Sequence, residues 1–202
     1  MIRSARRWMV QLGTFIVVSC LCTPLLWATT YTIDKHHSSV SFKIRHLFSK
    51  VEGTFREFDG SFTYVPGQPE QWKADAAIQA ASIDTRVDKR DEHLRSKDFL
   101  DVAQHPAITF QSTKVTDATE AGGTLHGVLS LHGVQQPVAL HLTIHGEGKD
   151  PWGNVRAGAT ATTKINRKDF GIVWNKTLET GAFLLGDELD IVLEIEGIKK
   201  EE

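Results

Sequence analysis

The sequence predicts an all-β protein, with one antiparallel barrel of about eight strands and a short helical insert. Most of the chain alternates apolar and polar residues with a period of two, as strands with a single buried face do. Short turns rich in glycine and proline separate the alternating segments. A charged segment over residues 82–112 breaks the alternation. A closed barrel is the simplest arrangement for these strands, because closure leaves no exposed sheet edge.

Residues 1–28 have the pattern of a cleaved secretory signal peptide. Three arginines precede an apolar stretch over Trp8–Leu26, and Ala28 is a suitable cleavage point. The stretch is too short for a convincing transmembrane span, so no such segment is expected after cleavage. A second interpretation treats residues 17–20 as a lipoprotein box, in which Cys20 becomes a lipidated N-terminus.

Residues 29–202 are expected to form a single domain. Both cysteines, Cys20 and Cys22, lie in the leader, so the mature chain has no disulfide, thiol nucleophile or cysteine metal site. It carries 20 basic and 25 acidic residues. This balance argues against nucleic acid as a partner, because nucleic acid requires a basic face.

The first half of the chain contains three alternating segments. The first long strand is expected over Ser38–His46, where His46 falls on the apolar face. Val51–Tyr64 continues as strand with a phase slip, which indicates a β-bulge around residues 56–57. Lys73–Ser82 follows a proline-glycine turn and places alanines on its inner face.

The charged segment is expected to hold a helix over residues 85–94. Thr85 and Asp88 have the spacing of a capping box, although aspartate replaces the usual glutamate. Val87 and Leu94 are seven residues apart and therefore share one face of a helix. Extended chain returns at Pro106, because the residue before a proline avoids the helical region.

The second half returns to strands with single apolar faces. The expected inner rows run over Ile108–Ser112, Leu125–Leu131, Val138–Ile144, Val155–Ile165 and Leu189–Ile195. Gly133–Pro137 is expected to be a hairpin loop, and Asn166–Gly171 a polar, partly helical turn.

Alanine is unusually common on the inner faces of two strands. One row contains Ala157, Ala159 and Ala161, and another contains Ala74, Ala76 and Ala80. Gly127 adds another small position that is expected to leave space in the bore. An eight-stranded barrel can be filled by its own side chains or can hold one small ligand. Small inner residues favour space for a ligand. The alternative is that they let strands pack closely, or that the charged insert plugs the bore.

Four further residues are candidates for ligand contacts. His46 is either a hydrogen-bonded core histidine or a polar anchor for a head group. Arg167 can pair with a phosphate or quinone oxygen, while Phe170 and Trp174 flank an apolar tail. Alternatively, Arg167 forms a structural salt bridge with an acid of the 84–101 insert.

No metal site, cofactor or catalytic activity is expected from the motifs. His141 and His145 are four residues apart on a strand, which separates them by ~13 Å. That distance is too long for two ligands of one zinc ion. The chain contains no G-x-S-x-G, no H-E-x-x-H and no glycine-rich phosphate loop.

Several motifs together resemble the YceI-like family. They are YTIDKHHSSVSFKIRH, the order SIDT, RDEHLRSKDFLD and ITFQS, then LHGVLSLHGVQQPVAL and INRKDFGIVW, and they span Tyr31–Ile198. The resemblance implies a lipocalin-like periplasmic barrel that binds a polyisoprenoid chain.

The combined interpretation is a periplasmic carrier for a long amphiphilic lipid, a polyisoprenoid or an isoprenoid quinone. The residues expected to bind it are Phe42, His46, Ala157, Ala159, Ala161, Arg167, Phe170 and Trp174. One alternative is an enzyme or redox accessory acting on such a lipid. Another is a structural protein with a vestigial pocket. The sequence leaves a homodimer open.

Overall fold

The structure, a computed structural model, describes residues 28–200. The signal peptide expected over residues 1–28 lies outside them, apart from its last residue. The strands are β1 (Thr29–Ile33), β2 (Ser39–His46), β3 (Ser49–Phe55), β4 (Phe58–Tyr64), β5 (Lys73–Gln79), β6 (Ile83–Asp84), β7 (Ala107–Thr119), β8 (Gly122–Leu131), β9 (Val134–Lys149), β10 (Val155–Asn166) and β11 (Leu185–Lys199). The helices are α1 (Asp88–Arg95) and three 3-10 helices, η1 (Pro69–Gln71), η2 (Ala80–Ser82) and η3 (Arg167–Phe170).

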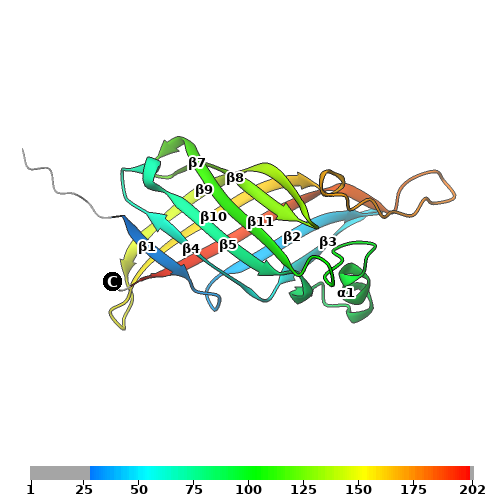
Figure 1. Cartoon of the computed structure of the whole chain (residues 1–202), viewed down its shortest axis with the longest axis horizontal. Helices are drawn as coiled ribbons and strands as arrows, with labels where there is room; N and C mark the ends of the chain where they lie inside the picture. Colours follow the sequence, from blue (N-terminus) through cyan, green and yellow to red (C-terminus); the bar gives the residue numbers. More distant parts are fainter. Residues whose placement is uncertain (1–27, 201–202) are drawn as a thin grey trace, which may run out of the picture.

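The strands close into an antiparallel barrel with eight positions in its wall, which confirms the predicted fold (Figure 1). β1 and β2 pair with successive parts of β11, so together they fill one position. β3 pairs with β2 while β4 pairs with β1, and β6 pairs with β3 while β5 pairs with β4. Three wall positions are therefore broken in the middle. They consist of β1 with β2, β4 with β3, and β5 with β6. The expected bulge at residues 56–57 is instead the break between β3 and β4.

The two ends of the barrel differ. One end, called the helix end, carries α1, the β2–β3 turn, the β8–β9 turn and the loop before β11 (Figure 1). A backbone hydrogen bond ties two of these parts together, since the amide of Leu47 in the β2–β3 turn donates to the carbonyl of Leu184 before β11. The opposite end, called the far end, carries the β9–β10 turn.

The insert forms its helix three residues later than expected. α1 begins at Asp88, and its N-cap is Val87, which makes no side-chain capping bond and is 46% exposed. Thr85 is not the cap, because its amide and hydroxyl both donate to the buried Asp91 carboxylate, at 2.9 Å and 2.5 Å. A buried carboxylate needs such donors more than the helix end needs a cap. Leu94 packs against the core, whereas Val87, predicted to share its helix face, lies outside the helix.

The β8–β9 connection is shorter than expected. Leu131 pairs with Val134, so the turn contains only His132 and Gly133, with φ of 54° and 74°. Positive φ at both positions is the two-residue hairpin geometry that matches strand twist. Pro137 therefore lies within β9, where only β8 pairs with it, since β10 pairs only from His141 onward. A proline is tolerated where one side of the strand has no partner.

One arginine organises the far end. Arg156, on β10, binds Asp34 and Asp150, both at 2.8 Å, and Glu196 at 2.5 Å. Asp34 precedes β2 and Asp150 lies in the β9–β10 turn, so the arginine joins three parts of the chain. The Arg156 guanidinium holds the pKa values of Asp34 and Asp150 well below the ordinary range of an aspartate.

Replacing Arg156 with methionine should lower the melting temperature at pH 7. The depressed carboxylate pKa values contribute stability above the unfolded value of ~3.9, and this contribution is lost as pH falls through the lower folded values. The difference between wild type and variant should therefore shrink between pH 5 and pH 2 in thermal melts. An equal difference at pH 7 and pH 2 would contradict this assignment.

Candidate functional site

The inner faces of the strands enclose one elongated cavity of about 440 Å³. It extends from Ile33 and Trp72 toward the far end to His46 and Leu184 at the helix end. The predicted inner rows contribute to its wall, including Val40, Phe42, Ile44 and His46 of β2, Val138, Leu140, Leu142 and Ile144 of β9, and Leu189, Ile191, Leu193 and Ile195 of β11. Almost all of this wall is apolar.

The alanine row of β10 borders open space. Ala157, Ala159 and Ala161 all line the cavity, as their alternation predicted. Ala157 and Ala161 are 3% and 6% exposed, whereas Ala159 retains more accessible surface although it faces inward. Ala159 therefore faces a part of the bore that no other side chain fills.

The inner glycines have a different role. A Cβ added at Gly127 would lie 2.4 Å from the Phe110 ring, and one at Gly53 would lie 2.4 Å from the Phe42 ring. Each glycine therefore accommodates an aromatic ring against the wall. The prediction that Gly127 adds empty space is wrong, because Phe110 occupies that space.

Arg167 is buried at the helix end, but other groups of the protein already accept most of its hydrogen bonds. It lines the cavity, is 2% exposed, and donates to the carbonyls of Gly186, Ile172 and Trp174. Its acidic partner is Asp187 at 3.2 Å, not an acid of the 84–101 insert. Burial lowers the pKa of Arg167, and Asp187 opposes that shift. The guanidinium thus holds the loop between β10 and β11 against the barrel.

Arg90 lines the cavity wall and was not among the residues predicted from the sequence. It lies on α1, and its Nε and Nη2 groups donate to the hydroxyl and carbonyl of Thr85, both at 2.7 Å. Its Nη1 group has no hydrogen-bond partner among residues 28–200, and no ion pair in that range involves it. The available signal was its position four residues before Leu94, on the face of α1 that packs inward.

An aromatic cluster closes the cavity at the helix end. The His93 ring lies 5.0 Å from the Phe99 ring and 4.9 Å from the Trp174 ring, edge to face in both cases. His93 also contacts Asp98, with 3.0 Å between Nε2 and the carboxylate. All three rings line the cavity. Phe170 does not, because it is 1% exposed and packs in the core beside the wall.

Seven of the eight residues predicted to bind ligand therefore lie in the cavity wall. His46 is at its helix end, and its ring has no hydrogen-bond partner within residues 28–200. A bore of this kind can bury an apolar chain along its length. The imidazoles of His46 and His93 and the guanidinium of Arg90 can contact a polar or anionic head group at the helix end.

No helix within the described residues is long and apolar enough to cross a membrane.

The family model described as "YceI-like domain" matches residues 31–197. A relative, the UPF0312 protein of Azotobacter vinelandii, is 44% identical over 176 residues, which cover 86% of this chain and 88% of the relative.

Two solved structures have the same fold. BcnA of Burkholderia cenocepacia has a TM-score of 0.72 and 22% identity, over 81% of this chain and 98% of that chain. A polyisoprenoid binding domain from Saccharophagus degradans, implicated in plant cell wall breakdown, has a TM-score of 0.63 and 16% identity, over 84% and 98% of the two chains.

Gly127→Ala should destabilise the protein by ~1–3 kcal/mol, because the new methyl group overlaps the Phe110 ring and a backbone oxygen 2.5 Å away. Gly148→Ala is the matched control, since a Cβ there meets nothing within 4 Å. Its effect should remain within about 0.5 kcal/mol. Denaturant unfolding measures both, and equal effects would refute this account of Gly127.

Proposed function

This chain belongs to the YceI-like family, and from that premise we propose that it is a periplasmic carrier or store for a long amphiphilic lipid. The lipid class we propose is a polyisoprenoid or an isoprenoid quinone. The periplasmic location rests on the expected signal peptide. The family and its barrel fold are associated with binding rather than with catalysis.

The observation that carries this proposal is the continuous apolar bore. Its volume of about 440 Å³ falls in the range of small-molecule sites, ~300–1,000 Å³. Burying an apolar chain contributes ~25 cal/mol per Å² of surface, before the cost of ordering the chain. The neighbour from Saccharophagus degradans, itself described as a polyisoprenoid binding domain, supports the same ligand class.

The polar groups suggest how the ligand is oriented. Arg90, His93 and His46 lie at the helix end, whereas the middle of the bore is lined by alanine, leucine and isoleucine. A head group at the helix end would satisfy the free Nη1 donors of Arg90. The tail would then run past Ala159 toward the far end.

Ala159→Trp should reduce the amount of lipid recovered with the purified protein while leaving it folded. The indole would fill space that the tail would otherwise occupy, and overpacking is costly only where no void exists. Mass spectrometry of organic extracts and thermal melts measure the two effects. Thr162→Trp, whose side chain is outside the cavity wall, is the control and should retain the lipid.

Two outcomes would contradict the proposal at this row. One is unchanged lipid content together with a stability loss of ~1–3 kcal/mol, which would indicate a filled bore. The other is a wild-type protein that yields no extractable lipid and also cannot be loaded with a polyisoprenoid or a quinone.

Arg90→Met should weaken binding of an anionic amphiphile by about 10- to 100-fold, the range of a charge-assisted hydrogen bond of ~1.5–3 kcal/mol. Lys89→Met removes the same charge from an exposed neighbour outside the cavity wall, and it should have little effect. Titration with a fluorescent prenyl phosphate measures both. Equal losses in the two variants would show that Arg90 makes no specific contact.

A further inference from the structure

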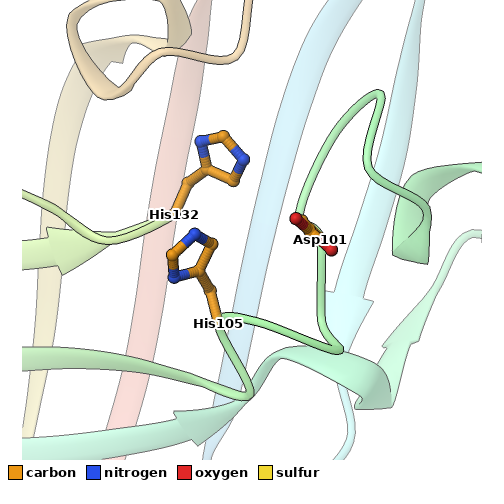
Figure 2. Close-up of side chains that lie close together, drawn as sticks. All are labelled: Asp101, His105 and His132. Atoms are coloured by element: carbon orange, nitrogen blue, oxygen red, sulfur yellow. The ribbon is translucent and has the colours of Figure 1, made fainter.

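Three side chains outside the cavity gather at the helix end. Asp101 and His105 follow α1, and His132 lies in the β8–β9 turn (Figure 2). One ligand atom from each lies within 4.8 Å of the other two. Both imidazole rings lie on one side, and the Asp101 carboxylate lies across from them (Figure 2). We propose that these three residues bind a divalent transition-metal ion, with Zn²⁺ as the representative ion.

The His132 ring is held with one nitrogen free. Its Nδ1 lies 3.1 Å from the carbonyl of Phe170, which can only accept a hydrogen bond. Nδ1 must therefore carry the proton, and Nε2 of the neutral ring keeps its lone pair. Metal-binding histidines are commonly oriented in this way, by a backbone carbonyl on the nitrogen that does not bind the metal.

The other two ligands are positioned by a tight turn. The carbonyl of Asp101 accepts the amides of Gln104 and His105, at 2.9 Å and 2.8 Å, which brings both side chains to one place. The His105 ring lies against Gly133, where an added Cβ would be 2.6 Å from the ring. The two imidazole centroids are 5.0 Å apart. Small side-chain rotations can therefore bring all three ligand atoms to zinc distance.

The charge of this cluster is not neutralised by a basic side chain. Within residues 28–200, no ion pair involves Asp101, His105 or His132. A second cluster of similar composition, Asp34, His37 and Glu196, differs in this respect. Arg156 binds both of its acids, so a guanidinium already takes the place of a cation there.

The donor set selects the class of ion. Two imidazole nitrogens and one carboxylate oxygen suit Zn²⁺ and related ions, whereas Mg²⁺ and Ca²⁺ prefer oxygen ligands alone. Three protein ligands leave at least one position for water. Two of them, Asp101 and His132, have left-handed backbones, with φ of 43° and 54°. That conformation is uncommon outside glycine, although Asp and His are among the residues enriched in it.

A metal at this position would join the insert to the barrel. Asp101 follows Leu100, and His132 follows Leu131, and both leucines line the cavity. The ion would therefore fix the segment after α1 against the β8–β9 turn. This role depends on the contacts of the insert and not on the identity of any lipid.

Calorimetric titration of the untagged protein with Zn²⁺ should show one site per chain, and Co²⁺ should give a visible absorption band. His132→Asn and Asp101→Asn should weaken Zn²⁺ binding about 100-fold or more, since even loss of an outer-shell partner costs about 10- to 100-fold. Asparagine tolerates the left-handed backbone, so both variants should fold. His37→Asn, in the second cluster, should bind Zn²⁺ like wild type.

Hydrogen exchange provides a readout without any lipid. Zn²⁺ should slow amide exchange over residues 96–106 in wild type and in His37→Asn, but not in His132→Asn. Failure of wild type to bind Zn²⁺ at 100 µM would overturn the proposal. So would binding that survives His132→Asn and Asp101→Asn, because the ion would then lie elsewhere.

Discussion

The closed ring of eight wall positions is the constraint on which the rest of the molecule depends. Strand number and tilt fix the width of a barrel, so side chains cannot pull its walls together to remove a void. Whether the bore is full or hollow is then decided by the size of the inward side chains. At Gly127 a small residue is offset by the Phe110 ring, whereas at Ala159 nothing replaces the missing volume. The volume of the cavity therefore depends on which inward positions are left unfilled.

Which side chains of a strand face inward was predictable from the sequence. The lengths of the turns and the positions of the strand breaks were not. Alternation is a local property of the backbone, so the inward row of β10 could be read from residue types alone. The two-residue turn at His132 was missed because histidine is not the usual residue there. The break between β3 and β4 depends on β1 and β2 meeting β11 in succession, which no local pattern reveals.

The same distinction applies to the polar groups of the site. The residues next to Arg167 in the sequence marked it as a candidate. Its partners include the carbonyl of Gly186 and the carboxylate of Asp187, which the fold brings to it from β11. Arg90 lies in the charged segment and was not among the residues predicted to bind ligand. Its inward position depends on α1 packing across the barrel end, and on Asp91 being buried beside Thr85. The partners of Arg167 lie 19 and 20 residues away and carry no signature in a single sequence, whereas the spacing of Arg90 from Leu94 was a local signal.

β11 pairs with β10 on one side and with β1 and β2 on the other, and within residues 28–200 it is the last strand in chain order. During synthesis from the N-terminus the sheet therefore stays open until β11 has emerged. During that interval the edges of β10 and β2 lack partners, and the bore lacks one wall. Closure pairs β1 with β11, which are far apart in the sequence, and folding is slower where such non-local contacts dominate. The cavity is therefore enclosed only when β11 has paired on both of its sides.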